Sequence, residues 1–149
     1  MRKYNFLLEG KNVNFVEDIL KVLEEISTPL YIYLSEFNVI PSNNGNSQAD
    51  ILERDNLIEF SSMIRFNHFS LIELTDFSRL LKKCENIWDL NFIVVSKIQS
   101  VEELYQNIET AKSFCICLEI EEEEIITFSV SDSFVKQFEK VLKIHNAIL

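Results

Sequence analysis

The sequence predicts an α+β fold, with residues 1–149 as a single domain whose mixed, largely antiparallel sheet carries about four helices on one face. Two patterns lead to this prediction: apolar residues recur in turn with helical and strand spacing, and the last third reads as a hairpin followed by a helix. Gly and Pro number only two each, which argues against the many short strands of a sandwich or barrel. With 47% hydrophobic residues, the chain is long enough to bury one core.

The first third of the chain is expected to form a β-α-β unit. Residues 4–8 read as a short strand, and the apolar residues between positions 13 and 26 recur at helical spacing. Asn12 or Asn14 is the expected N-cap of that helix. Residues 30–34 are apolar throughout and rich in aromatic and branched side chains, which is typical of a central strand.

The middle of the chain is less regular. Residues 41–50 have loop composition, PSNNGNSQAD, and are long for a bare connection. Residues 51–60 fit neither period clearly, whereas residues 60–75 read as two short strands broken near Asn67. Residues 76–85 then predict a short helix with Cys84 on its apolar side.

The second half contains the clearest patterns. The Ser and Glu of SVEE match a capping box, in which each side chain satisfies a free amide at a helix start. The expected elements are a buried strand at residues 92–95, a helix at 100–112, a hairpin with an acidic tip at 113–120 and 124–130, and a terminal helix at 131–148.

The charge balance is strongly acidic. Fourteen Lys and Arg against 24 Asp and Glu give a net charge of −10, which repels phosphate backbones and anionic lipids. We therefore expect neither nucleic acid nor a membrane as partner, and a protein partner would be basic. The sequence shows no signal-peptide pattern and no apolar stretch of about 20 residues, and its three Cys suggest reduced thiols, so we expect a cytoplasmic protein.

No catalytic or metal-binding motif stands out. Cys115 and Cys117 would share one face of a strand, but His68 and His145 are far away in sequence and no Cys-x-x-Cys pair exists. The two glycines stand alone, outside any phosphate-binding pattern. We expect no catalytic residue, no metal ligand and no cofactor, and a non-enzyme is the favoured interpretation.

Acidic residues at the predicted hairpin form the candidate interaction surface. Four successive glutamates on a hairpin tip cannot converge on a calcium ion, so a solvated turn is the expected structure. The residues that we single out for binding a basic partner are Glu119, Glu121, Glu122, Glu123 and Glu124.

Several segments of the second half resemble, in their layout, small uncharacterised domains of Bacillus-type bacteria. They are FSLIEL, SVEELYQNI, the acidic hairpin and SDSFVKQFEKVLKI. This resemblance implies no activity that could be assigned to any residue. In size and charge the chain is also similar to bacterial immunity proteins, which neutralise basic toxin domains.

Three functional hypotheses follow from these observations. The first is a non-enzymatic protein-interaction or accessory protein, with an immunity-type protein as its more specific form. The second is an enzyme or small-ligand binder whose lid is the loop of residues 41–50, with Tyr31, Tyr33 or His68 near it. The third is homo-oligomerisation through a Phe-rich sheet surface.

Overall fold

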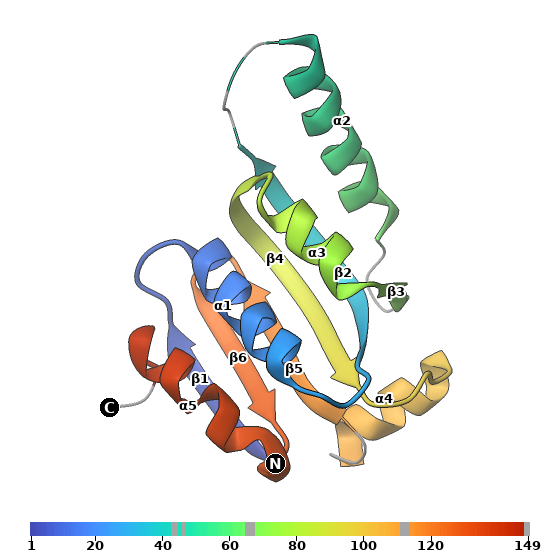
Figure 1. The fold of residues 1–149 in the computed structure, drawn as a ribbon, viewed down its shortest axis with the longest axis vertical. Helices are drawn as coiled ribbons and strands as arrows, with labels where there is room; N and C mark the ends of the chain where they lie inside the picture. The colour runs from blue at the N-terminus through green and yellow to red at the C-terminus, as the bar shows by residue number, and fades with distance from the viewer. Residues whose placement is uncertain (43–44, 46, 65–67, 111–113, 148–149) are drawn as a thin grey trace.

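The computed structural model describes residues 1–42, 45, 47–64, 68–110 and 114–147, and it has the predicted α+β class. Six strands form one sheet in the order β1-β6-β5-β4-β2-β3, and each neighbouring pair runs antiparallel (Figure 1). The strands are β1 (Arg2–Leu7), β2 (Tyr31–Pro41), β3 (Ser70–Ile72), β4 (Cys84–Val95), β5 (Phe114–Glu121) and β6 (Ile125–Val130).

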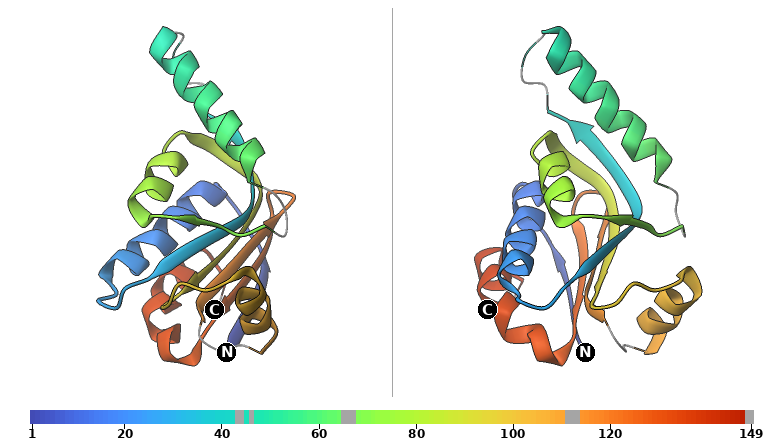
Figure 2. Two further views of the ribbon diagram at one scale, coloured as in Figure 1. Left: turned by 90° about the vertical axis from the view of Figure 1, so that its right-hand side faces the viewer. Right: turned by 45° about the vertical axis from the view of Figure 1, so that its right-hand side comes forward.

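The helices lie on both faces of the sheet rather than on one. Three of them cover one face, a fourth packs on the opposite face, and α2 projects beyond the end of the sheet (Figure 2). The covering helices are α1 (Asn12–Glu25), α3 (Leu74–Leu81) and α5 (Val135–Ile144), the opposite one is α4 (Val101–Thr110), and the projecting one is α2 (Gln48–Met63). A short 3₁₀ turn, Asp132–Phe134, precedes α5.

The main core fills the space between the sheet and α1, α3 and α5. Phe15 on α1 is fully buried and packs edge-on against Phe6 and Phe128, with ring centroids 5.6 and 6.4 Å apart. Phe128 also contacts Phe138 of α5, at 5.5 Å. Edge-on aromatic pairs add to the stability gained by burial, so the abundance of Phe in the sequence is used here in the core.

Asn12 links the start of α1 to strand β4 and to the turn between β5 and β6. Its Nδ2 donates to the backbone carbonyls of Ile87 at 2.6 Å and Glu123 at 3.0 Å, and its Oδ1 accepts from the Ile87 amide at 3.0 Å. The predicted N-cap role is wrong: Lys11 is the N-cap, and it makes no side-chain cap. The Asn12 amide instead satisfies backbone groups of β4 and of the β5–β6 turn.

Strands β2 and β4 are much longer than predicted. They pair along a ladder that runs from Tyr31 paired with Val95 to Pro41 paired with Cys84. Three irregularities, after Leu34, Asn38 and Ile40, interrupt its register, and a β-bulge shifts the alternation of inward and outward side chains. Cys84 therefore opens β4 rather than lying on a helix.

Helix α2 occupies a segment whose residues show no clear periodic pattern. It includes residues 60–63, for which a strand was predicted, and only Leu57 is buried. A helix that buries a single residue has no apolar stripe to reveal its period. The second predicted strand exists as β3, whereas the predicted break at Asn67 lies outside the described residues.

Candidate protein-interaction surface

The face of the sheet opposite α1 is covered only at one end. There α4 closes a second, smaller apolar cluster, which consists of Tyr33, Ile93, Val95, Leu104 and Cys117. The remainder of this face carries none of the described helices (Figure 2). The uncovered part is therefore the place to look for a binding surface.

Strand register places a row of polar residues across the uncovered part. A single row of paired residues crosses five strands, from β1 to β2: Asn5, Thr127, Glu119, Asn91 and Glu36. Residues paired across antiparallel strands project to the same side of the sheet. Carboxylates and amides from distant parts of the sequence thus lie in one row across the sheet, where only Thr127 separates Asn5 from Glu119.

Further acids adjoin this row. Glu121 follows two positions after Glu119 on β5, so it points to the same side, and Asp89 precedes Asn91 by two positions on β4. We call Glu36, Asp89, Glu119 and Glu121 the acidic face. None of these four forms an ion pair with another residue that the structure describes.

The carboxylates of the acidic face repel one another. Burial raises the pKa of Glu36, and the charges of Asp89, Glu121 and Glu119 raise it further. Burial also raises the pKa of Glu119, where Glu121 adds to the shift and Lys3 opposes it. Both shifts have the direction expected for partly buried acids that lie next to other carboxylates.

A small hollow lies within the acidic face. It has a volume of about 80 Å³ and is lined by Glu36, Leu90, Asn91, Glu119 and Glu121. The side-chain Oδ1 of Asn91 is buried, and no described group donates a hydrogen bond to it. We call this hollow the notch.

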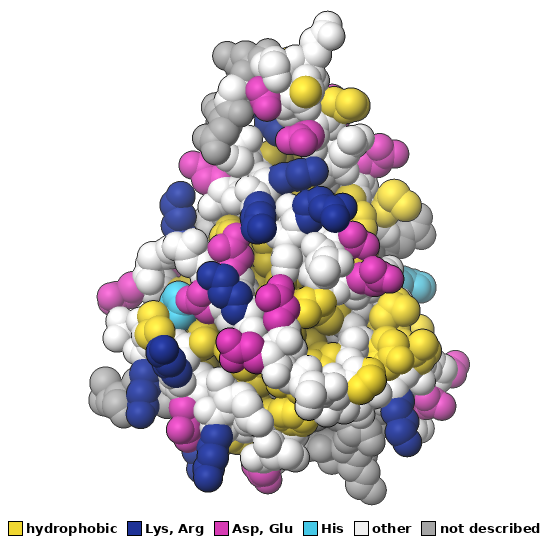
Figure 3. Space-filling model, viewed as in Figure 1, with side chains coloured by type: hydrophobic (Ala, Val, Ile, Leu, Met, Phe, Trp, Pro, Cys, Tyr) yellow, Lys and Arg dark blue, Asp and Glu magenta, His cyan; other side chains and the backbone are white. Residues whose placement is uncertain are grey.

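The other face of the sheet provides a contrast. Figure 3 looks onto the side covered by α1, α3 and α5, where Lys and Arg side chains are interspersed with Asp and Glu. Three of the ion pairs there join Lys21 to Asp18, Arg79 to Asp76 and Lys83 to Glu53. On the acidic face the carboxylates gather without such partners.

The structure divides the five predicted surface residues into two groups. Glu119 and Glu121 belong to the acidic face, whereas Glu122 and Glu123 form the β5–β6 turn with positive φ of 50° and 68°. Glu123 is tied to the body, because its carboxylate accepts from the Asn86 side chain. Glu124 is exposed, and its carbonyl accepts from the Leu8 amide at 2.9 Å.

Sequence reasoning missed Glu36 and Asp89 as members of the surface. Glu36 lies beyond the predicted end of its strand, and Asp89 lies before the predicted start of the next. Their proximity to Glu119 depends on which strands pair and in which register. The alternation of polar and apolar residues within one strand does not carry that information.

The three cysteines are buried thiols. Burial raises the pKa of Cys84 and Cys117 to about 12 and that of Cys115 to about 11. Within the described part of the chain, no group of three or more His, Cys, Asp or Glu is placed to hold a metal ion.

The structure does not bring the two histidines to the cysteines of β5. His68 is exposed, next to β3. His145 lies on the helical side of the sheet, with its Nε2 2.8 Å from Oδ2 of Asp18 and its ring edge-on to Phe15. Cys117, by contrast, belongs to the cluster on the opposite face.

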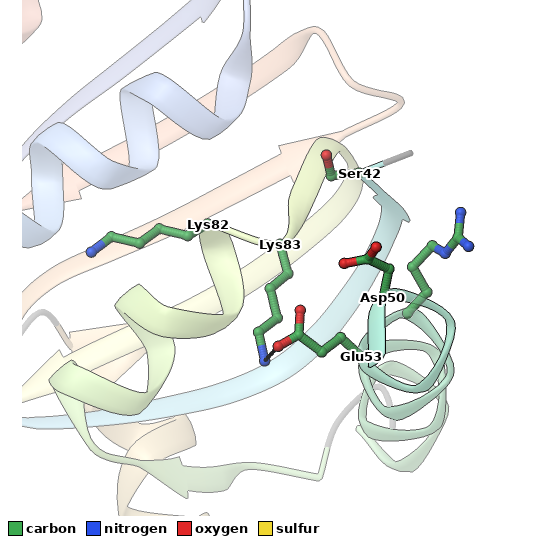
Figure 4. A pocket seen from close by; sticks show the side chains of 6 residues that line it. Ser42, Asp50, Glu53, Lys82 and Lys83 are labelled. Carbon is green, nitrogen blue, oxygen red and sulfur yellow. Dashed lines mark ion pairs between the residues drawn. The ribbon is translucent and has the colours of Figure 1, made fainter. Parts of the chain in front are cut away.

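A polar hollow of about 260 Å³ lies between the start of α2 and the α3–β4 turn. Its charged groups do not converge (Figure 4): Lys83 faces Glu53 at 4.0 Å, whereas Lys82 points away from both acids. Asp50 is engaged with Ser47 in a capping box. Part of the predicted lid loop adjoins this hollow through Ser42 and Asp50, but residues 43, 44 and 46 lie outside the described structure.

The tyrosines that we associated with a ligand site have a structural environment. Tyr33 belongs to the second apolar cluster, and its hydroxyl accepts a hydrogen bond from the Gln99 amide at 3.2 Å. Tyr31 packs against the same cluster. Neither tyrosine lines the polar hollow.

Fold and surface together define an α+β protein with one antiparallel sheet. Helices α1, α3 and α5 cover one face of this sheet, α4 covers one end of the other, and the acidic face lies on the part that the described helices leave uncovered. No family model, curated protein or solved structure matches the chain. In the described ranges, no helix combines the length and the apolar character needed to cross a membrane.

Proposed function

We propose that this protein is a non-enzymatic interaction protein that binds a basic surface of a partner protein through its acidic face. The observation that carries the proposal is the group of four carboxylates on an uncovered sheet face, with no described cation paired to any of them. Such a group destabilises the free protein by repulsion. A cationic partner would remove that repulsion, so the same feature that costs stability favours binding.

An immunity-type role is the more specific form of this proposal. An acidic face suits a basic toxin domain because complementary charges steer the two proteins together. The ligand-binding alternative has less support, since at the polar hollow Lys83 is paired with Glu53, Asp50 is engaged with Ser47, and Lys82 points away from both acids. A toxin reading frame next to this one, and protection of cells that express that toxin, would support the immunity-type role.

The test uses two variants with the same loss of charge. In the first, Glu36, Glu119 and Glu121 become Gln; in the second, the exposed acids Glu9, Glu24 and Glu25 become Gln. Partners are captured from the native cell at low and high salt, identified, and their affinity is measured with purified proteins. We expect the first variant to lose at least tenfold in affinity and the second to bind nearly as the parent does.

Salt dependence provides the second criterion. Electrostatic association weakens as ionic strength rises, because mobile ions screen the charges. Equal affinity of the parent and the first variant for the identified partner, or affinity unchanged between low and high salt, would contradict the proposal.

A further inference from the structure

We propose that the side of α2 that points away from β2 binds a basic amphipathic helix of a partner protein. We call this side the outer face, and its apolar members, all of them exposed, are Ile51, Leu52, Ile58 and Met63. The surface belongs to a different element from the acidic face, so the inference does not rest on the proposed function.

Exposed apolar side chains are concentrated on α2. Of the thirteen large hydrophobic residues that are exposed in the described part of the chain, four lie on this helix, whereas α1 and α3 carry none. Their exposed fractions run from 45% for Ile51 to 68% for Met63. Figure 3 shows hydrophobic side chains open to solvent on the projecting part of the molecule that α2 forms. Apolar groups that gather on one surface mark an interaction site, whereas single ones are ordinary.

Helical geometry places these four residues on one side of α2. Ile51 and Ile58 are seven positions apart, which is about two turns, and Leu52 and Met63 are eleven positions apart, which is about three turns. The two pairs are offset by about 100° around the helix axis. Leu57, the buried residue of α2, lies on the other side. The helix is therefore apolar both where it packs on the sheet and where it faces solvent.

The inner side of α2 already has its partner in β2. The Phe60 ring lies edge-on to Phe37 of β2, with centroids 6.0 Å apart, and the Ser61 hydroxyl donates to the Phe37 carbonyl. The outer face takes no part in these contacts. Helices with apolar residues all round are typically covered on all sides. The outer face thus lacks the cover that its composition calls for.

The charges of the outer face select a basic occupant. Asp55 and Glu59 follow Ile51 by four and eight positions, which places both acids between the two apolar pairs. Both are exposed, and no ion pair joins either of them to a described residue. Arg54, the cation of this helix, lines the polar hollow instead. Lys or Arg side chains of a partner would pair the two acids while its apolar side chains cover the rest of the face.

A second copy of this chain fits the outer face poorly. An isologous contact sets the same patch against itself, so Asp55 and Glu59 of one copy would face the same acids of the other. Two chains that each carry a net charge of −10 also repel one another. A partner helix with a basic polar side avoids both penalties.

The length of the outer face sets the size of the partner segment. Ile51 to Met63 spans twelve residue steps, which is about 18 Å along the helix axis. A helix laid along this surface needs at least about three turns to reach both ends. It also needs an apolar stripe with residues spaced by three and four, flanked by Lys or Arg.

The test is an NMR titration of the full chain with a synthetic helical peptide of about 14 residues, in which Leu forms one stripe and Lys the other side. A scrambled peptide of the same composition controls for charge alone, and an analogue with Glu in place of Lys controls for the apolar stripe alone. We expect the first peptide to shift the methyl signals of the four apolar outer-face residues. It should bind at least fivefold more tightly than the scrambled peptide, and the Glu analogue should cause no comparable shift.

Paired substitutions make the test specific to the outer face. Leu52→Gln with Met63→Gln removes two of the four apolar side chains, keeps a residue type that favours helices, and should weaken peptide binding at least fivefold. Leu52→Gln alone serves if the double variant does not fold. The matched control is Ile98→Gln with Ile144→Gln, because these side chains are similarly exposed, at 66% and 61%, but lie outside α2. Its binding should equal that of the parent.

Several results would overturn the inference. Equal affinity for the scrambled peptide, or parent affinity in a folded outer-face variant, would show that the apolar stripe is not recognised. A parent chain that sediments as a dimer and becomes monomeric in the double variant would show that a second copy covers the outer face. Binding to neutral phosphatidylcholine vesicles that the double variant abolishes would assign the face to a membrane.

The inference and the proposed function fail separately. The variant in which Glu36, Glu119 and Glu121 become Gln loses most of the acidic face but keeps α2, so we expect the peptide to shift the same α2 signals in it as in the parent. Shifts confined to the acidic face and its notch, or loss of the α2 shifts in this variant, would place the peptide on the sheet. The inference would then be wrong, whereas the proposed function would still be decided by partner capture.

Discussion

Asn12 is a polar residue that the fold buries almost completely, with 1% of its surface exposed. Replacing it by alanine removes its hydrogen bonds to the Ile87 amide and to the backbone carbonyls of Ile87 and Glu123. We expect Asn12→Ala to lower the free energy of unfolding by about 2–4 kcal/mol. Urea denaturation of the variant and of Asn14→Ala, a change at an exposed position of the same helix, measures the difference. A loss of similar size in both would contradict this account.

The acidic face has a measurable effect on stability. Because the pKa values of Glu36 and Glu119 are raised on folding, their contribution to stability is complete below the unfolded pKa, about 4.3, and is lost as the pH rises through the folded pKa. We expect Glu119→Gln to stabilise the protein at pH 7 by a few tenths of a kcal/mol, up to about 1 kcal/mol.

The pH dependence of that gain is the decisive measurement. The advantage of Glu119→Gln should disappear near pH 4, where the parent glutamate is protonated as well. Glu122→Gln is the matched control, since Glu122 is an exposed turn residue. A gain that persists at pH 4 would show that the effect does not come from charge repulsion.

The thiols offer a test of burial at single residues. With pKa values of about 11 to 12, little thiolate forms at pH 8 in the folded protein. We expect the native chain to react with a disulfide reagent on the order of a hundredfold more slowly than the urea-unfolded chain. Rapid labelling of the native protein, read by mass spectrometry at Cys84, Cys115 or Cys117, would contradict the burial seen here.

Among the elements, α2 depends most on local interactions. Ser47 accepts from the Asp50 amide at 3.1 Å, and Asp50 accepts in turn from the Ser47 amide, while only Leu57 is buried. We expect Ser47→Ala to destabilise the start of α2 by about 1 kcal/mol. Faster hydrogen exchange at residues 48–55, with little change in global unfolding, would show this. Ser62→Ala, near the other end of the helix, should leave that exchange unchanged.

The elements also show which features of the fold can be predicted from the sequence. Helices α1 and α5 were predicted because each has an apolar stripe that faces the core. Helix α2 has no such stripe, and β2 and β4 contain irregularities that interrupt their alternation. Patterns along one segment reveal an element only where that segment packs on a single regular face.

The candidate surface, too, could be predicted only as far as patterns within one segment reach. Two of its four acids were singled out in the sequence, because Glu121 begins a conspicuous run of glutamates and Glu119 lies two positions before it. Glu36 and Asp89 come from strands whose extent and pairing are set by tertiary contacts. Their place in the acidic face could not be predicted from spacing within the sequence.

For the molecule as a whole, the sheet separates two apolar clusters of unequal size. Leu104, which is fully buried, connects α4 to the smaller one. We expect Leu104→Ala to lower the free energy of unfolding by about 2–4 kcal/mol, because it leaves a cavity beneath the only described helix on that face. Thermal unfolding measures this, with Ile98→Ala at a 66% exposed position as the control. Equal effects of both changes would contradict a second core.

The edge position of β1 has a consequence for how the chain is made. Among the described strands, Arg2–Leu7 pairs with β6 alone, which lies more than a hundred residues further along the chain. A ribosome adds about 5–20 residues per second, so this segment waits on the order of ten seconds for its neighbour. During that time Tyr4, Phe6 and Leu7 lack the strand that pairs with them, so this aromatic segment stays open to a holding chaperone until β6 has been made.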